Sequence, residues 1–502
     1  MGKLKINYDN LYILFIIAIV VTGIILRVIF YSYGRPLYVD ESSLALNIIN
    51  LNNYFQPLNH EQACPPLFMY ISKLVYLTGN ILNIKGEYSL RLIPLLSSIL
   101  SIPVFYFVVK KILTTKISQI IAVFLFVFNH RICYYAQEFK QYSTEVLIFL
   151  LIIAGFLYID TEKINFRTKV LIGLLLGICI WISNAAAIIA CAIGIIYLIK
   201  TITKQTSWKD FAVLILPAAI SALLYLVIMH NTMGNEYLYT YWGDFFIKYN
   251  LSNLPDILVA NSRYFFARKY IPLILALLGF IFFIREPKKE KNLLITLPVL
   301  ILAALSYMHI YPLGDRVVLF LQPVYIIYIC KTVEVALKEN KYLAFVILFL
   351  TLTLSMYNFA RTSKIILTKD YIDENIYELL KQSEPYIKSG DTLFVIIDSS
   401  NWEYYIRFFN LPDVKIIRYY PGLDAKDQNP INRKIESAIE RTHLDFYKKI
   451  AALPKSNYYF LMAGDFNRDY NLKVIKTLSR KHNGQLLYID NKNNALFHIE
   501  IK

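Results

Sequence analysis

The sequence predicts a polytopic α-helical membrane protein with about 11 transmembrane helices, followed by a soluble α/β domain. Of its 502 residues 57% are hydrophobic, and the mean hydropathy is +0.45. Apolar runs approaching the roughly 20 residues that cross a bilayer recur up to residue 360, and the composition becomes that of a soluble protein from residue 361. We therefore expect a membrane domain over residues 1–360 and an α/β domain over residues 361–502. An ordinary soluble globule is excluded.

The net charge of +16 follows membrane topology, because lysine and arginine cluster between the apolar runs. That pattern is typical of the positive-inside rule rather than of nucleic-acid binding. Lys3 and Lys5 precede the first run and predict a cytoplasmic N-terminus, which places the soluble domain outside. No cleavage pattern follows the first run, so it stays as a span. Abundant Lys, Ile, Asn and Tyr suggest an AT-rich bacterial genome, hence a bacterial inner membrane.

Eleven apolar runs place every short basic loop on one side of the membrane. The predicted spans are Leu11–Phe30, Leu90–Val109, Ile117–Phe128, Gln141–Ile159, Val170–Ile182, Ala185–Leu198, Phe211–Ile228, Tyr270–Ile284, Leu293–Met308, Val317–Ile329 and Tyr342–Phe359. The run from Pro65 to Thr78 is too short for a span and contains Lys73, so it predicts a juxtamembrane or re-entrant helix. If it crossed, every later loop would swap sides.

An acidic pair, Asp40 and Glu41, follows the first span. After it, Ser42–Phe55 carries apolar residues at helical spacing and asparagines on the other faces. This pattern predicts an amphipathic helix lying on the membrane surface. One alternative is that Asp40 simply caps that helix.

Polar side chains concentrate on the predicted outer side: Asp40, Glu41, His60, Glu61, Arg131, Glu138, Lys140, Arg263, Arg268, Asp315 and Arg316. Carboxylates beside cations at this interface suit transfer of a sugar from a lipid phosphate. The cations can balance the phosphate charge as the sugar–phosphate bond breaks. A carboxylate can accept the proton of the acceptor hydroxyl, and a single direct displacement predicts inversion at the anomeric carbon.

Five segments of the first 330 or so residues carry a family resemblance. They are Val39-Asp40-Glu41, PPLFMY at Pro65–Tyr70, EYSLRLIP at Glu87–Pro94, YAQEFKQYS at Tyr135–Ser143, and Gly314-Asp315-Arg316 through Gln322-Pro323. In this order they resemble the polyprenyl-phosphate-dependent GT-C glycosyltransferases, a group with protein O-mannosyltransferases and lipid A aminoarabinose transferases. The resemblance implies the GT-C fold, a polyprenyl-phosphate sugar donor and an extracytoplasmic acceptor that is a lipid, a glycan or a protein.

The resemblance also implies roles for individual residues. Asp40 matches the catalytic base, with Glu41 as its supporting partner. Lys140, where many relatives have arginine, and Arg316 would contact the lipid phosphate. Glu138 and Tyr142 would line the sugar or acceptor site. Cys64 departs from the pattern, because aminoarabinose transferases have a lysine there, which leaves the donor sugar open.

Other side chains have two interpretations. His60 and Glu61 could bind the acceptor or a metal, or form a surface pair. Tyr135 and Trp242 could stack on a sugar, or belong to the interfacial aromatic belt. Arg316 could instead be a snorkelling anchor, and Arg91 is interpreted as structural, at the mouth of the second span.

The α/β domain is predicted from strand-like runs that alternate with helix-like ones, Asp373–Tyr386 and Ile431–Ile450. The predicted strands are Thr392–Ile397, Lys415–Tyr419, Tyr458–Met462, Gln485–Ile489 and Ala495–Ile501. The domain has no glycine-rich phosphate loop, and Asp398 and Asp465 are expected in loops. We expect an accessory role, in binding the acceptor or covering the active site.

The five cysteines show no metal-ligand spacing, so no cofactor is predicted, although a divalent metal stays open. Cys64 and Cys133 both fall in predicted outer loops, which leaves a disulfide open. The main alternative function is a membrane transporter or a lipid or glycan flippase, but the spans carry almost no mid-span charge and show no inverted repeat. A non-catalytic scaffold or a glycan polymerase would not require Asp40 and Lys140 together.

Overall fold

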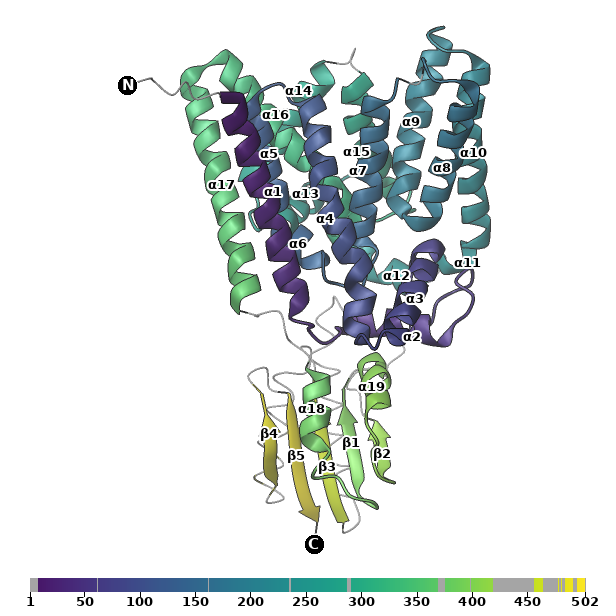
Figure 1. The fold of residues 1–502 in the computed structure, drawn as a ribbon, viewed down its shortest axis with the longest axis vertical. Coiled ribbons are helices and arrows are strands. Elements are labelled where there is room, and N and C mark those ends of the chain that lie inside the picture. Colours follow the sequence, from purple (N-terminus) through teal and green to yellow (C-terminus); the bar gives the residue numbers. More distant parts are fainter. Residues whose placement is uncertain are drawn as a thin grey trace.

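The structure is a computed structural model in which a bundle of long helices stands above a small sheet domain (Figure 1). It describes residues 8–60, 62–160, 162–233, 236–286, 290–368, 375–397, 399–418, 456–463, 477, 480, 484–490 and 494–501. The bundle consists of α1 (Tyr8–Ser32), α4 (Gly86–Ile112), α5 (Lys116–Val127), α6 (His130–Tyr135), α7 (Tyr142–Tyr158), α8 (Phe166–Ile182), α9 (Asn184–Ile202), α10 (Trp208–Ile228), α11 (His230–Met233), α12 (Glu236–Tyr241), η1 (Gly243–Phe245), α13 (Leu254–Phe266), α14 (Ile271–Arg285), α15 (Glu290–Tyr307), η2 (Asp315–Leu321), α16 (Gln322–Glu339) and α17 (Lys341–Thr368).

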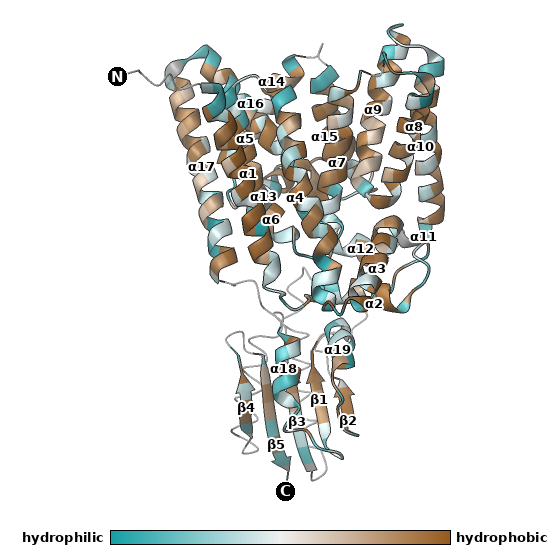
Figure 2. Cartoon of the chain, viewed as in Figure 1, coloured by the Kyte–Doolittle hydropathy of each residue, from teal (hydrophilic) through white to brown (hydrophobic). Residues whose placement is uncertain are grey.

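Each predicted span overlaps a helix of the bundle, and Val317–Ile329 begins in η2 and continues into α16. Among the described residues, 7 helices are long and apolar enough to cross a membrane, and a pair bent by 110°, α13 with α14, raises the number to 8. The other three predicted spans correspond to the shorter helices α5, α7 and α8. The chain is therefore a multi-pass membrane protein, and the count of about 11 crossings stays a prediction. Apolar residues cover most of the bundle helices, with polar residues at their ends (Figure 2).

The predicted surface helix after the acidic pair is shorter and more deeply buried than the sequence suggests. Helix α2 spans Val39–Asn50, and its residues from Glu41 to Ile48 are all buried. The buried amide of Asn47 is paired within the protein, because it donates to Ser43 O at 2.8 Å and accepts from Asn59 N at 2.7 Å. The expectation of an amphipathic helix over Ser42–Phe55 lying on the membrane is therefore wrong.

Helix α3 (Pro66–Ile81) occupies the predicted juxtamembrane position, next to α2 at the end of the bundle that faces the sheet domain (Figure 1). A proline at the first helical position suits a helix start, because the missing N–H has no intrahelical acceptor there. With 16 residues, α3 is not among the membrane-crossing helices.

All five predicted strands form one mixed sheet in the order β2-β1-β3-β5-β4. They are β1 (Thr392–Ile396), β2 (Lys415–Arg418), β3 (Ser456–Met462), β4 (Gln485–Ile489) and β5 (Ala495–Ile501), with α18 (Ile376–Ser383), α19 (Ser399–Tyr405) and η3 (Ile406–Phe408). Strand β1 is parallel to β2 and β3, and β5 is antiparallel to β3 and β4. The composition changes at residue 361, whereas α17 runs to Thr368. The predicted Ile431–Ile450 helix, Asp398 and Asp465 lie outside the described residues.

The sheet domain docks on the bundle through α19, which packs on α2. Apolar residues of both domains belong to one buried cluster that includes Leu44, Ile48, Leu379 and Val395. Hydrogen bonds cross the junction, among them those from Leu37 N to the Tyr405 hydroxyl at 2.6 Å and between the Ser43 and Ser400 hydroxyls at 2.7 Å. Helix α2 therefore depends on the sheet domain for part of its burial.

Replacing Tyr405 by Phe should destabilise this junction. The variant leaves the N–H of Leu37 buried without its acceptor, which costs about 1–3 kcal/mol. We expect a lower thermal unfolding midpoint for the purified protein in detergent. Tyr377→Phe, at a tyrosine of the same domain that is 39% exposed, is the matched control. Equal midpoints for the two variants would contradict the role of this bond.

Candidate active site

Asp40 lies in the first turn of α2 and forms an ion pair with Arg316, at 2.8 Å between Oδ2 and Nη1. Both side chains are about one-fifth exposed, at 22% and 21%, so the pair is open to an entering ligand. Burial alone would raise the pKa of Asp40, but Lys140 and Arg316 outweigh it and hold that pKa below its usual value. Asp40 is therefore an ionised carboxylate between two cations.

Glu41 has a different environment from its neighbour. Its fully buried carboxylate meets Arg91 at 2.7 Å and Arg35 at 3.1 Å, and accepts the N–H of Phe139 at 2.6 Å. Burial opposes the charge, yet the two arginines lower the pKa of Glu41 to about 2. Glu41 also accepts the N–H of Tyr38 at 3.0 Å. Glu41, rather than Asp40, therefore accepts a backbone N–H at the start of α2.

The turn before η2 determines the orientation of the Arg316 side chain. Asp315 adopts a positive φ of 57°, a conformation that aspartate tolerates better than most residues, and its N–H bonds to Asn261 Oδ1 at 3.3 Å. A side chain at Gly314 would overlap Phe245 at 1.9 Å. The guanidinium of Arg316 then faces the rings of Tyr241 at 5.9 Å and Trp242 at 5.7 Å.

Lys140 and Glu138 come from the loop between α6 and α7. The ammonium of Lys140 donates to Gln62 Oε1, and its charge is among those that act on Asp40. Glu138 is only 3% exposed. Burial and the Glu41 charge raise the pKa of Glu138 to about 7, against the opposing effect of Arg35 and Arg316. The carboxyl group of Glu138 can therefore change charge near neutral pH.

Two of the predicted aromatic residues lie at the same site. The rings of Tyr135 and Tyr142 meet edge to face with centroids 5.1 Å apart, and Tyr142 interacts electrostatically with Arg316 and Asp40. The Tyr135 hydroxyl lies 2.6 Å from that of Tyr264. The structure thus brings Asp40, Lys140 and Arg316 together with Glu138, Tyr142, Tyr135 and Trp242.

Of the predicted His60–Glu61 pair, His60 is not part of this grouping. His60 contacts the sheet domain, with Nδ1 3.4 Å from the Ser400 hydroxyl and Nε2 4.0 Å from Glu403. Glu61 lies outside the described residues. No group of His, Cys, Asp and Glu among the described residues could hold a metal ion. Cys64 and Cys133 are both buried and free, and Cys64 Sγ lies 3.5 Å from Gln141 Oε1.

Sequence reasoning missed two charged residues near the site. Arg35 precedes Asp40 by five positions and, besides its contact with Glu41, donates to Gln137 O at 3.1 Å. Glu145, 1% exposed, accepts the N–H of Asn184 at 3.2 Å. The sequence did carry a signal for Glu145: it is a carboxylate near the start of a predicted span, and no cation lies at helical spacing from it. For Arg35 the signal was its closeness to the acidic pair.

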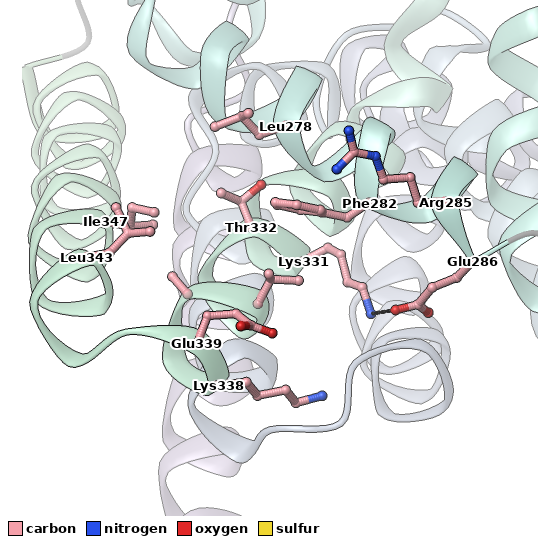
Figure 3. A pocket seen from close by; sticks show the side chains of 12 residues that line it. Leu278, Phe282, Arg285, Glu286, Lys331, Thr332, Lys338, Glu339, Leu343 and Ile347 are labelled. Atoms are coloured by element: carbon pink, nitrogen blue, oxygen red, sulfur yellow. Dashed lines mark ion pairs between the residues drawn. The ribbon is translucent and has the colours of Figure 1, made fainter.

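A cavity of about 570 Å³ lies between α14, α16 and α17, at the opposite end of the bundle. Its lining includes Arg285, Lys331 and Lys338, and Lys331 approaches Glu286 at 3.6 Å (Figure 3). Glu334 additionally pairs with both lysines. None of the predicted site residues lines this cavity.

The fold and the site together define a polytopic membrane protein of the GT-C fold, with a charged side-chain cluster where the helix bundle meets the sheet domain. No family model matches the sequence, and no curated protein matches it. Among solved structures, the chain is similar to ArnT from Cupriavidus metallidurans bound to undecaprenyl phosphate, with TM-score 0.51, 10% identity and 98% of each chain covered. The apo state of ArnT gives TM-score 0.50 and 13% identity over 95% of this chain and 97% of that one.

A further similar structure is the archaeal oligosaccharyltransferase AglB from Archaeoglobus fulgidus in complex with an inhibitory peptide and a dolichol-phosphate. It gives TM-score 0.46 and 11% identity over 96% of this chain and 74% of that one. The near-complete coverage by ArnT confirms the GT-C fold that the sequence motifs predict.

Removing the Glu41 carboxylate by Glu41→Ala should destabilise the protein by about 3–5 kcal/mol, because Arg35 and Arg91 stay buried without a counter-charge. The pKa of Glu41 is lowered from 4.5 to about 2, so its contribution is present above pH 4.5 and is lost only as the pH falls toward 2. Thermal unfolding at pH 7 measures the effect. The control is Asp160→Asn, which breaks an exposed ion pair with Lys163 and should leave the midpoint unchanged.

Proposed function

We propose that the protein is an inverting membrane glycosyltransferase, which transfers one sugar from a polyprenyl-phosphate donor to an extracytoplasmic acceptor. The observation that carries the proposal is the Asp40–Arg316 pair beside Lys140. It puts a partly exposed carboxylate next to two cations at the end of a membrane bundle. These are the groups that a displacement on a lipid-linked sugar needs.

Arg316 and Lys140 would bind the donor phosphate. Arginine and lysine form strong charge-assisted hydrogen bonds with phosphate oxygens. The ion pair with Asp40 holds the Arg316 side chain in place while no phosphate is bound. A phosphate that binds Arg316 would compete with Asp40 for the guanidinium, and this competition would release the carboxylate for catalysis.

Asp40 would then act as the general base. The acceptor hydroxyl oxygen attacks the anomeric carbon, and its proton passes to the Asp40 carboxylate. The bond from the anomeric carbon to the phosphate oxygen breaks, and the lipid phosphate leaves with the electron pair. The phosphate is a good leaving group and remains beside Arg316 and Lys140, whose charges stabilise it. One displacement inverts the anomeric configuration.

The aromatic residues around the cations would hold the sugar. Tyr142 and Tyr135 border the pocket on one side, and Trp242 packs against the Arg316 guanidinium. Aromatic rings offer a flat apolar surface with a polar rim, which suits a sugar ring. Glu138 would hydrogen bond to the sugar or the acceptor.

The structural neighbour supports a lipid-phosphate donor, because the ArnT structure is bound to undecaprenyl phosphate and aligns with 98% of this chain. The positive-inside pattern supports a cytoplasmic N-terminus. With the count of about 11 spans, the pocket and the sheet domain would then lie outside the cytoplasm.

Asp40→Asn should abolish transfer while preserving the fold. Asparagine keeps the shape of the side chain but cannot accept the proton, so we expect a loss of about 10²–10⁴-fold in turnover. The measurement is release of lipid phosphate from a panel of polyprenyl-phosphate sugars by the full chain in liposomes. Asp256→Asn, at an exposed carboxylate of α13, is the matched control. Wild-type turnover in Asp40→Asn would remove Asp40 from the mechanism.

Donor binding should weaken as the pH rises through about 7, the raised pKa of Glu138. Below that pH Glu138 is neutral; above it the new negative charge competes for Arg316 and repels the donor phosphate. We therefore expect the KM for the donor to increase at alkaline pH in the wild type. Glu138→Gln, which stays neutral, should have a KM that does not change across this range. A KM that rises equally in both proteins would assign the titration to another group.

A further inference from the structure

Three arginines gather at the end of the bundle that faces the sheet domain, and we call Arg131, Arg268 and Arg361 the cationic cluster. Arg131 lies over the ring of Tyr264, 4.0 Å from its centroid, and Arg268 lies over Tyr357 at the same distance. Arg361 follows Tyr357 by one turn of α17, so both lie on one face of that helix. The cluster thus joins α6, the bend between α13 and α14, and α17.

His130 lies within electrostatic range of two of these guanidinium groups. Burial and the charges of Arg131 and Arg361 together lower the pKa of His130 to about 3. An imidazole at this position is neutral at physiological pH. It therefore adds no positive charge to the cluster.

The cluster has no carboxylate partner among the residues that the structure describes. No ion pair within 4.0 Å is formed by any of the three arginines in the described part of the chain. Buried lysines at the opposite end differ: Lys169 pairs with Asp210, Lys200 with Glu162 and Glu290, and Lys331 with Glu334. Three uncompensated guanidinium groups create a positive field that favours an anion.

Apolar side chains adjoin the cluster on the two helices that carry it. On α14, Ile271 and Ile274 are 44% and 56% exposed, directly after Arg268 in the chain. On α17, Leu352 and Met356 are 46% and 57% exposed, one to two turns before Arg361. Cations at the end of a bundle, next to lipid-facing apolar surface, match the two parts of an anionic lipid.

We propose that the cationic cluster binds the phosphate headgroup of a second lipid, distinct from the sugar donor. Its acyl chains would lie along α14 and α17, and its phosphate would meet Arg268, Arg361 and Arg131. A soluble phosphate would gain binding free energy from the cations alone, whereas a lipid would gain more by also burying the exposed apolar surface. The donor site assumed here rests on the proposed function.

The cluster lies next to the candidate active site but is separated from it by two tyrosines. Tyr264, under Arg131, shares a hydrogen bond of 2.6 Å with Tyr135, which interacts with Arg316 and Glu138. A headgroup at the cluster therefore approaches the donor pocket without occupying the Arg316–Asp40 pair. The two lipid sites are neighbours, and both can be filled.

Lipid binding to the full chain in detergent, followed by native mass spectrometry, tests the proposal without requiring any transfer. The probes are phosphatidylglycerol, which is anionic, and phosphatidylcholine, which is zwitterionic. A basic side chain near an anionic headgroup contributes roughly fivefold in affinity. The triple variant Arg131→Gln, Arg268→Gln, Arg361→Gln should thus bind phosphatidylglycerol about 100-fold more weakly than wild type, and phosphatidylcholine unchanged.

The matched control removes three charges at the opposite end: Lys110→Gln, Lys111→Gln, Lys209→Gln. These cations also lie over aromatic rings, at 6.0, 4.4 and 5.2 Å. The control should keep wild-type affinity. If it weakens binding as much as the cluster variant does, binding follows net charge and the proposal fails. Should the triple variant not fold, Arg268→Gln replaces it, since this exposed arginine contacts only one ring surface.

Two competitors identify the occupant. Inorganic phosphate and undecaprenyl phosphate should each leave phosphatidylglycerol bound. Displacement by inorganic phosphate would make the cluster a free-anion site, and displacement by undecaprenyl phosphate would make it part of the donor site; either result overturns the proposal. An inactive protein that still binds phosphatidylglycerol through the cluster would refute the proposed function alone.

Discussion

The site depends on one buried carboxylate, Glu41, held between Arg91 and Arg35. The three side chains come from α2, from α4 and from the turn between α1 and α2, so their charges fix α2 against the bundle. Phe139 N–H, also bonded to Glu41, attaches the loop that carries Glu138 and Lys140. A buried ion pair is a weak source of stability compared with apolar packing. It nevertheless fixes the relative positions of its side chains, because separating them leaves a buried charge without a partner and costs free energy.

Two adjacent carboxylates thus have separate tasks because their environments differ. Glu41 is enclosed and permanently charged, with its oxygens already occupied by arginine and backbone donors. Asp40, one residue earlier, is partly exposed and pairs with Arg316, a cation that a phosphate could also bind. The same helical turn therefore provides a structural anchor and a reactive group. The anchor sets where the reactive group lies.

Apolar runs predicted the helices that match the expected spans, but not α6, α11, α12 or α13. Alternating patterns predicted each of the five strands, since both signals are local in sequence. The burial of α2 was not predictable, because it requires the contact between Tyr405 and Leu37, which are 368 residues apart. The grouping of Asp40, Lys140 and Arg316 followed from a family resemblance, whereas the link of Glu41 to Arg35 needed coordinates. Hydropathy alone also did not predict the bend of 110° between α13 and α14.

Charge is distributed differently at the two ends of the bundle. Positive charge at one end is balanced locally, as Lys331 is by Glu334 and Glu286, so its main effect is on topology. At the end that faces the sheet domain, the arginines over Tyr264 and Tyr357 have aromatic rings instead of carboxylates beside them. A ring holds a guanidinium in place without cancelling its charge. Such cations stay ordered and can bind an anion without first displacing a carboxylate partner.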